Sequence, residues 1–304
     1  MNGIELPSIS VVTSCFNAGE LVEDTIRSVV QQRYPRLQYV FIDGASKDNT
    51  FEIARRYEQD IAVLLSERDD GQYHGIQKGM ALANGDVMAW LNGDDIYCPW
   101  TLSVVGEIFA RFPEVDWIVG TSSFMNGAGQ CTRVSGNSGT AMPREYIRNG
   151  WFRPELAGYL QQESMFWRRS LWEKVGGLDL SLSLAADFDL WRRFAEHAEL
   201  HAVNIPLALF RQRPGLQRSS AGQKSYESEV ARICELLPKP PGLWAALSNR
   251  GEQWRHLARS LVWKKSSVIA FAGQQQAWTR INARRPLART SLADLLLEKS
   301  LRQG

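Results

Sequence analysis

The sequence has few cysteines, no long apolar run and no leader-like amino terminus. Its four cysteines lie far apart without C-x-x-C spacing, which argues against a zinc site or a disulfide framework and fits a reducing cytoplasm. No stretch approaches the roughly 18 uninterrupted apolar residues that a membrane-spanning helix needs. The opening "MNGIELPSIS" lacks a basic segment followed by an apolar one, so we expect no secretory signal.

Charge is nearly balanced over the whole chain but is unevenly distributed. The 304 residues carry a net charge of +2, with 44% hydrophobic and 22% charged residues, as in ordinary soluble globular proteins. From Gly242 onward, 11 lysines and arginines face 3 aspartates and glutamates, so this segment has a charge of +8 and the preceding residues −6. The same segment contains Trp244, Trp254, Trp263 and Trp278. The sequence therefore predicts a body followed by a basic, aromatic extension.

Apolar periodicity predicts strands that alternate with helices over the first 120 residues. Strands are expected at 8–16, 37–43, 61–66, 86–91 and 115–120, with amphipathic helices between them. This alternation indicates an α/β fold with a largely parallel central sheet flanked by helices. Ligands of such sheets bind beyond the carboxyl ends of the strands. Because polar residues follow three of these strands, at 13–17, 43 and 92–95, we expect them to meet at one rim.

The pattern loosens beyond residue 120. Alternation around Asn126-Gly127 predicts a hairpin. One helix is expected to end at Gly176-Gly177 and another to begin near Ala186. From about residue 225 the sequence is interpreted as helices broken at 238–242 and near 286.

The stretch "AWLNGDD" places Asn92, Asp94 and Asp95 directly after an apolar strand. Carboxylate and amide oxygens with a neighbouring glycine suit Mg²⁺ or Mn²⁺, especially where a diphosphate supplies further ligands. The alternative is a hydrated loop in which an aspartate caps the next helix. The residues alone leave both open.

Other acidic and basic side chains also allow two interpretations. Asp43 ends a strand, where it could bind a ribose or a base, or could stabilise the turn at Gly44. The charged loop 67–71 and Lys78 could lie near a diphosphate or could be solvated. Asp187 and Asp189 lie two residues apart on one helix, so one can face the rim while the other caps or forms a salt bridge. A carboxylate facing a substrate hydroxyl could take its proton.

Taken together, three blocks resemble glycosyltransferase family 2. They are "VVTSCFNAGELVEDTIRSVVQQRYPRLQYVFIDGASKDNT", "SERDDGQYHGIQKGMALANGDVMAWLNGDD" and "VGGLDLSLSLAADFDLW". The resemblance covers residues 8–220 and implies an inverting, metal-dependent enzyme with the GT-A fold. Within the family the chain is most similar to non-processive bacterial transferases that build cell-surface polysaccharide, because the Q-x-x-R-W motif of processive members is missing.

The resemblance also implies roles for individual residues. Thr13 and Asp43 match the positions that hold the nucleoside. Asn92-Gly93-Asp94 matches the D-x-D motif, with Asp94 as the metal-binding acid and Asp95 as its neighbour. Asp187 matches the catalytic base. Gln162 and Glu163 match a segment near the acceptor side. Residues 210–220 match the mobile loop that closes over the donor.

Two departures from the family pattern concern the metal. The first motif acid is replaced by Asn92, and Arg213 stands where many relatives have a metal-contacting histidine. A metal would therefore be held more weakly, or Arg213 would neutralise the diphosphate directly as a bidentate donor. A third departure is Ala186, where many relatives have glutamate before the catalytic aspartate.

The resemblance implies a nucleotide-diphospho-sugar donor, with UDP favoured over GDP or dTDP. It also implies Mn²⁺ or Mg²⁺ as cofactor and a glycan or lipid-linked acceptor. A catalytic domain is expected over 1–224, with a donor half to about 120 and an acceptor half beyond it, followed by a helical extension over 225–304. Alternatives are a nucleotide-sugar-binding pseudoenzyme or scaffold, and a nucleotidyltransferase, which usually has a basic Gly-rich loop that "TSCFNAGE" lacks.

The basic extension has two open interpretations. Its Arg, Lys and Trp residues could contact an anionic bilayer, which would put the protein at the inner face of the cytoplasmic membrane. They could equally pack on the catalytic domain or on a second subunit. No recognised motif supports nucleic-acid binding.

Overall fold

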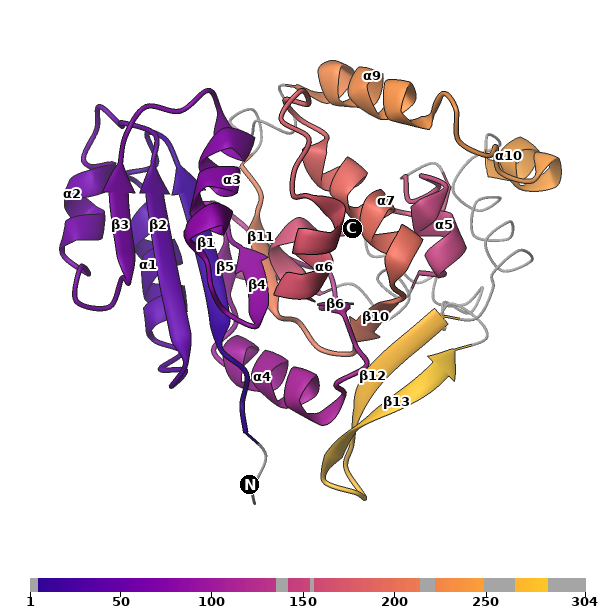
Figure 1. Ribbon diagram of the computed structural model, residues 1–304, viewed down its shortest axis with the longest axis horizontal. Helices are drawn as coiled ribbons and strands as arrows, with labels where there is room; N and C mark the ends of the chain where they lie inside the picture. Colours follow the sequence, from indigo (N-terminus) through magenta and orange to yellow (C-terminus); the bar gives the residue numbers. More distant parts are fainter. Residues whose placement is uncertain (1–4, 135–141, 154–155, 214–221, 249–265, 284–304) are drawn as a thin grey trace, which may run out of the picture.

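A computed structural model describes residues 5–134, 142–153, 156–213, 222–248 and 266–283. Its central element is a nine-stranded sheet (Figure 1). In spatial order the strands are β13 (Ala277–Ala283), β12 (Ser266–Ala272), β10 (Leu200–Val203), β6 (Trp117–Val119), β9 (Met165–Arg168), β4 (Val87–Trp90), β1 (Ile9–Cys15), β2 (Leu37–Asp43) and β3 (Val63–Ser66). Five of the eight neighbouring pairs are parallel, and β9 runs antiparallel to both of its neighbours. The predicted, largely parallel α/β sheet is therefore confirmed.

Helices cover both faces of this sheet. One face carries α3 (Gln72–Leu82), α5 (Arg144–Arg148), α6 (Arg169–Val175) and α7 (Ala186–His197), and the other carries α1 (Val22–Val30), α2 (Thr50–Arg55) and α4 (Thr101–Arg111). Strand β2 supplies both cores, because Val40 and Ile42 pack with the first set while Tyr39 and Phe41 pack with the second. Burial on both faces explains why its residues 39–42 are all apolar.

A smaller sheet lies beside the carboxyl ends of the parallel strands. Its order is β5 (Ile96–Tyr97), β11 (Ala208–Arg211), β7 (Ser123–Met125) and β8 (Cys131–Val134). The predicted hairpin is confirmed, since β7 pairs with β8 around Asn126. The short 3₁₀ helix η1 (Gln162–Ser164) precedes β9. Strand β11 pairs with β5 and ends at Arg211, which contacts the loop that follows β4.

The carboxyl-terminal region differs from the helical prediction. Helices α9 (Gln223–Cys234) and α10 (Gly242–Ser248) are present as expected, and α9 lies over α7 (Figure 1). Residues 266–283, however, form a β-hairpin, so the helical prediction is wrong there. Strand β12 extends the central sheet by pairing in parallel with β10. The strand that pairs with β12 lies more than sixty residues earlier in the sequence. A local sequence pattern does not reveal so distant a partner.

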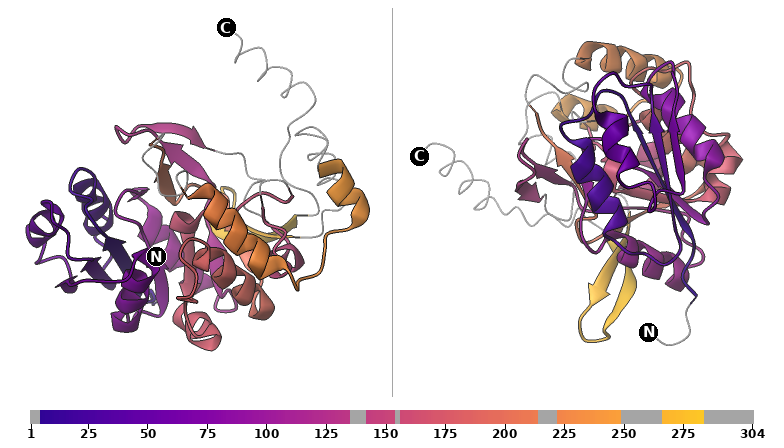
Figure 2. Two further views of the ribbon diagram at one scale, coloured as in Figure 1. Left: turned by 90° about the horizontal axis from the view of Figure 1, so that it is seen from above. Right: turned by 90° about the vertical axis from the view of Figure 1, so that its left-hand side faces the viewer.

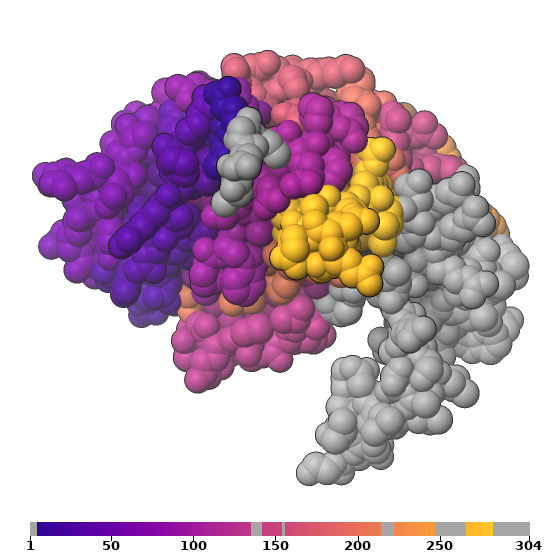
Figure 3. All heavy atoms as spheres, turned by 90° about the horizontal axis from the view of Figure 1, so that it is seen from below, coloured from indigo at the N-terminus to yellow at the C-terminus, as the bar shows by residue number. Residues whose placement is uncertain are grey.

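Two tryptophans of the basic extension are buried in the protein core. The Trp244 side chain is inaccessible to solvent and packs against the rings of Tyr146 and Trp151. Trp278, in the hairpin, is 6% exposed and donates its indole N–H to Glu107 of α4. The hairpin lies against α4 and projects below it (Figures 2 and 3). Packing on the catalytic body is thus confirmed for these two residues, while Trp254 and Trp263 lie outside the described residues.

In the part of the chain that the structure describes, no helix has the length and apolar character needed to cross a membrane.

Candidate active site

A cleft of about 780 Å³ lies at the carboxyl ends of β1 to β4. Its walls come from the residues that follow these strands and from β11. The polar segments predicted to share one rim meet there in part, because Ser14 to Asn17 and Asn92 to Asp94 line the cleft. Thr13, Asp43 and Asp95 do not line it, although Gly44 beside Asp43 does. The parallel direction of the strands is the physical cause, because it places their carboxyl ends at one edge.

The backbone at this rim adopts conformations that are uncommon for residues other than glycine. Asn17 and Ala45, which follow β1 and β2, both have left-handed φ angles, +49° and +59°. Such conformations cost energy in residues with a Cβ and concentrate at functional sites. A side chain at Gly93 would meet Cys15 Cβ at 2.7 Å, so only glycine lets the loop after β4 approach β1 this closely.

Asp94 and Arg213 form an ion pair in the cleft. Arg213 Nη2 donates to Asp94 Oδ2 at 3.0 Å, and the side chains are 27% and 30% exposed. Both residues line the cleft, together with Arg68. Arg68 belongs to the charged loop 67–71, which the sequence leaves open as a solvated loop or a neighbour of a diphosphate. Because this loop follows the third strand, Arg68 can reach the rim of the sheet.

Asn92, the residue in place of the first motif acid, has a fully used side chain. Its Oδ1 accepts from Gln72 Nε2 at 2.7 Å, and its Nδ2 donates to Gln162 Oε1 at 3.1 Å. Gln162 in turn donates to the carbonyl of Trp90 at 2.6 Å. Asn92 therefore ties the loop after β4 to α3 and η1.

Asp95 lies behind the cleft and is 1% exposed. Its Oδ1 accepts from the backbone N–H of Arg211, and its carbonyl accepts from Thr25 Oγ1. Burial raises the pKa of Asp95 well above its usual range, and the nearby Asp94 charge adds to the effect. In this structure Asp95 anchors the loop, and its predicted contact with the donor stays a prediction.

The two residues predicted to hold the nucleoside are buried near the cleft. Asp43 accepts from Ser46 N–H and Ser66 Oγ through Oδ2, while its Oδ1 has no partner within the described residues. Thr13 is fully buried and accepts from the hydroxyl of Tyr39. Neither lines the cleft directly, although Gly44 beside Asp43 does.

Lys78 does not reach the cleft lining. Its Nζ lies 2.6 Å from Glu67 Oε1 in a partly exposed ion pair, and Lys78 is not among the residues that line the cleft. Of the basic residues predicted near a diphosphate, the structure brings Arg213 and Arg68 into the cleft and leaves Lys78 outside it.

Asp187 lies in the first turn of α7, partly buried. Its Oδ1 accepts from the backbone N–H of Phe188 at 2.8 Å and lies 3.0 Å from the hydroxyl of Tyr73, on α3. The same hydroxyl lies 2.8 Å from the carbonyl of Leu184, so the two acceptors share its proton. Burial raises the pKa of Asp187, and the hydrogen bonds from Phe188 and Tyr73 offset part of the rise. A carboxylate with a raised pKa is better matched to taking a proton near neutral pH.

The turn before Asp187 is held in place by α9. The carboxylate of Glu229 accepts the backbone N–H groups of Ser183, Leu184 and Ala185 at 2.8–2.9 Å. These are amides just before the helix, which would otherwise need a capping residue. A helix predicted to lie outside the catalytic domain thus fixes the start of α7.

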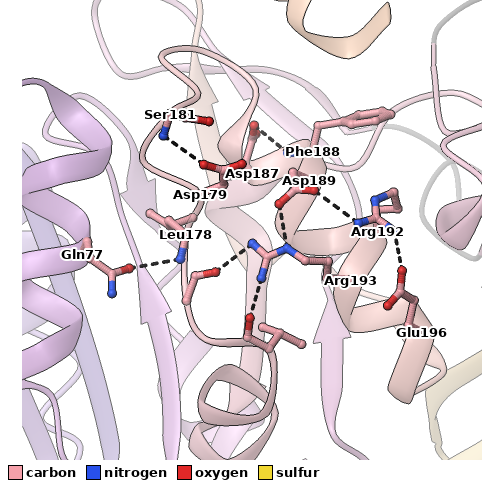
Figure 4. Close-up of polar contacts among 12 residues, drawn as sticks. Gln77, Leu178, Asp179, Ser181, Asp187, Phe188, Asp189, Arg192, Arg193 and Glu196 are labelled. Carbon is pink, nitrogen blue, oxygen red and sulfur yellow. Dashed lines mark hydrogen bonds and ion pairs between the residues drawn. The ribbon is translucent and has the colours of Figure 1, made fainter. Parts of the chain in front are cut away.

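Asp189 forms a salt bridge, one of the roles predicted for the second acid of the pair Asp187 and Asp189. It is 7% exposed and binds Arg193 Nε at 2.6 Å, and Arg192 lies at 3.4 Å (Figure 4). Arg193 also donates to the carbonyls of Val175 and Gly177. Asp189 therefore forms salt bridges within α7, and the Arg193 side chain that it holds joins α7 to the end of α6.

Glu163, on η1, is 3% exposed, and its Oε1 has no hydrogen-bond partner among the described residues. Burial raises the pKa of Glu163 to about 8, and the charges of Asp94 and Asp187 add to the rise. Asp94 and Asp187, on separate segments, thus both act on Glu163, although of these three residues only Asp94 lines the cleft.

The family model described as Glycosyl transferase family 2 matches residues 10–174, more than half of the chain. The chain belongs to glycosyltransferase family 2. An uncharacterized glycosyltransferase of Mycobacterium tuberculosis is 29% identical over 211 residues, which cover 67% of this chain and 75% of that protein. The putative teichuronic acid biosynthesis glycosyltransferase TuaG of Bacillus subtilis is 34% identical over 92 residues, 29% of this chain and 36% of TuaG.

Solved structures confirm the GT-A fold of this family 2 glycosyltransferase. S. aureus TarS, solved in complex with UDP-GlcNAc, superposes with a TM-score of 0.61 at 15% identity, covering 83% of this chain and 72% of that one. The mannosyltransferase PcManGT from Pyrobaculum calidifontis, in complex with GDP-Man and Mn²⁺, gives a TM-score of 0.56 at 18% identity, over 84% and 71% of the two chains.

The cleft of this glycosyltransferase fits a divalent metal only if the donor shares in holding it. Among the described residues no group of three or more His, Cys, Asp or Glu side chains could hold an ion. Asp94 offers one partly exposed carboxylate in the cleft, and a nucleotide diphosphate can complete an oxygen shell around Mg²⁺ or Mn²⁺.

Cys15 is the one cysteine that lines the cleft among the residues described. Burial raises the pKa of its thiol well above the usual range, and the charges of Asp43, Asp48 and Asp69 add to this effect. Its thiolate form is therefore disfavoured, which argues against covalent catalysis by this residue.

Proposed function

We propose that this glycosyltransferase moves a sugar from a nucleotide-diphospho-sugar to an acceptor hydroxyl with inversion at the anomeric carbon. The observation that carries the proposal is the Asp94–Arg213 pair in the cleft at the strand ends. A donor diphosphate bound here would meet two guanidinium groups, those of Arg213 and Arg68. The nucleoside would lie toward Asp43 and Thr13. Asp43 Oδ1, a buried atom with no hydrogen-bond partner among the described residues, is its proposed acceptor.

Asp187 is the proposed catalytic base. It would take the proton of the acceptor hydroxyl, whose oxygen then forms a bond to the anomeric carbon while the bond from that carbon to the diphosphate oxygen breaks. The nucleoside diphosphate leaves with the bonding electron pair. One displacement inverts the carbon, and no nucleophilic side chain is required. Gln162 and Glu163 are assigned to the acceptor side, next to the loop after β4.

A divalent metal, Mn²⁺ or Mg²⁺, is proposed at Asp94, where it would stabilise negative charge on the leaving diphosphate. Arg213 would share that task, because it already faces the Asp94 carboxylate. The Mn²⁺ in the PcManGT complex supports the choice of cofactor.

Relatives support the class of substrate. TarS was solved with UDP-GlcNAc and with UDP, and PcManGT with GDP-Man, so we propose a UDP- or GDP-sugar donor. The teichuronic acid role in the name of TuaG supports assembly of bacterial cell-surface polysaccharide. A cytoplasmic location, a lipid-linked acceptor and membrane contact of the basic segment stay predictions.

A nucleotide-sugar-binding protein without turnover is the second candidate. It is favoured by the use of the Asn92 side chain in internal hydrogen bonds and by Arg213 in place of histidine. Such a protein would bind the donor but would not hydrolyse or transfer it.

Thermal shift with UDP, GDP and dTDP sugars, with and without Mn²⁺, tests the proposal. One donor should raise the melting temperature. Slow hydrolysis of that donor should fall at least about a hundredfold in Asp94→Ala, and the surface variant Asp60→Asn should behave as wild type. Donor binding without hydrolysis would favour the second candidate, and no stabilisation by any donor would contradict both.

A further inference from the structure

Arg211 ends β11 and is buried, whereas the resemblance to family 2 implies only that it belongs to a mobile loop over residues 210–220. Its side chain is 1% exposed, and its guanidinium contacts three separate segments. Nε donates to the carbonyl of Asp94 at 2.7 Å, Nη1 to the carbonyl of Gly127 at 2.9 Å, and Nη2 to Asp24 Oδ2 at 2.9 Å. The three segments are the loop after β4, the β7–β8 turn and helix α1.

This arrangement needs the shape of arginine. The planar guanidinium presents several N–H groups at fixed angles, so one side chain can bind three acceptors in different directions. Lysine has a single nitrogen and a pKa that burial lowers readily, so it can replace only part of the contacts. A buried guanidinium must also be fully hydrogen-bonded to be tolerated, and Asp24 supplies the opposite charge.

The main chain of Arg211 acts on the same loop. Its backbone N–H donates to Asp95 Oδ1 at 2.9 Å, and its Nε holds the carbonyl of Asp94. Two residues further on, Arg213 binds the Asp94 carboxylate. Asp94 is therefore fixed at its main chain by Arg211 and at its side chain by Arg213.

Arg211 itself does not line the cleft, whereas Asp94 and Arg213 do. It cannot touch a donor bound there, but it determines where both groups that face the diphosphate lie. We propose that Arg211 is a positioning residue for recognition of the donor diphosphate, acting through Asp94 and Arg213. This inference rests on the proposed function, because it assumes that a nucleotide diphosphate binds in the cleft.

The test compares a nucleoside diphosphate with its monophosphate. The probes are UDP and UMP in Mn²⁺, or GDP and GMP if the wild-type chain binds the guanine pair, measured by isothermal titration calorimetry. Wild type should prefer the diphosphate. Arg211→Met should reduce that preference about tenfold or more, because Asp94 is released, while a merely structural role would lower the melting temperature and leave the preference unchanged.

Asp24→Asn is the matched control. It weakens the same network at the end remote from Asp94, where the Asp24 side chain is 55% exposed. We expect a lower melting temperature and a diphosphate preference within about twofold of wild type. Equal losses in Asp24→Asn and Arg211→Met would overturn the inference, as would a folded Arg211→Met with the wild-type preference.

Arg211→Lys covers the case in which Arg211→Met does not fold. It keeps the charge but only part of the contacts, so the preference should fall about threefold or more. A wild-type preference in Arg211→Lys would overturn the inference. If the wild-type chain binds neither nucleotide pair, the proposed function itself fails, which is a distinct outcome.

Discussion

Arg213 and Asp94 form a direct ion pair in the lining of the cleft, with Nη2 of the arginine 3.0 Å from Oδ2 of the aspartate. Since roughly a quarter to a third of each side chain is exposed, water screens the pair, and it is worth about 1 kcal/mol or less. A diphosphate, with two or more negative charges, can therefore draw Arg213 away from Asp94 at little cost.

Replacement of Arg213 should weaken diphosphate binding selectively. We expect Arg213→Ala to raise the dissociation constant for UDP about tenfold or more and that for UMP by less, because a charge-assisted contact is lost. Arg213→His, which restores the residue of many relatives, should bind UDP with a stronger dependence on Mn²⁺ than wild type. Calorimetry with Mn²⁺ and with EDTA measures both effects, and the exposed Arg55→Ala serves as control. Unchanged UDP affinity in Arg213→Ala would contradict the assignment.

The hydroxyl of Tyr73 should tune the proposed base. Because its hydrogen bond lowers the pKa of Asp187, Tyr73→Phe should raise that pKa further. The base is active when deprotonated, so the acidic limb of the profile of kcat against pH should move to higher pH. Asp187→Asn should lower kcat about a hundredfold or more while donor affinity stays within about twofold.

Tyr57→Phe is the matched control, since the Tyr57 hydroxyl also donates to a carboxylate, that of Glu23, away from the cleft. Its pH profile should equal that of wild type. A shift of the same size in both tyrosine variants would contradict a specific role for Tyr73.

Glu163 should make the protein less stable as pH rises. Its folded-state pKa is raised to about 8, so the folded protein binds this proton more tightly than the unfolded chain does. The resulting stability is fully present below the unfolded pKa of about 4.5 and is lost as pH rises through about 8. Between pH 5 and 8.5, urea unfolding should show a smaller loss for Glu163→Gln than for wild type. The exposed Glu52→Gln should follow wild type, and identical pH dependence of all three proteins would contradict the prediction.

The carboxyl-terminal hairpin should contribute to the stability of the catalytic body. Trp278 is 6% exposed and packs in the same core cluster as α4, so Trp278→Ala should cost about 3–5 kcal/mol of unfolding free energy. Its cross-strand neighbour Phe271 is 49% exposed, and Phe271→Ala should cost about 1 kcal/mol or less. Urea denaturation measures both, and a loss in Trp278→Ala no larger than in Phe271→Ala would show that the hairpin adds little.

Most of the donor half could be predicted from local pattern. The strand 37–43 was predicted with the observed bounds. Its apolar run from Tyr39 to Ile42 is too short for a buried helix and is typical of a buried strand. The meeting of Asn17 and Asp94 at one rim followed from the parallel direction of the strands, whereas Asp43, predicted at the same rim, does not line the cleft. These predictions needed only periodicity and the handedness of strand–helix–strand connections.

The missed features depend on distant partners. Strand β9 has four residues and joins a helix directly, so its sequence has no turn to mark it. Strand β12, "SSVIAFA", contains the β-branched pair Val268 and Ile269 before Gly273, a strand signal that was overridden by the helical prediction for the whole segment from residue 225. Arg211 lies within the segment 210–220 that resembles the mobile loop of the family, but its burial on a short strand is recognisable only from its acceptors.

The sequence by itself determined that strands and helices alternate, that acidic and amide residues follow the strands, and that the chain resembles glycosyltransferase family 2. The tertiary structure alone decided which of those side chains face the cleft. It turned Asp94 and Arg213 into the cleft, used Asn92 and Asp95 to hold the loop, and brought Glu163 close enough to Asp94 and Asp187 for their charges to affect it. The physical reason is that periodicity is local, whereas orientation and burial depend on contacts between segments far apart in the chain.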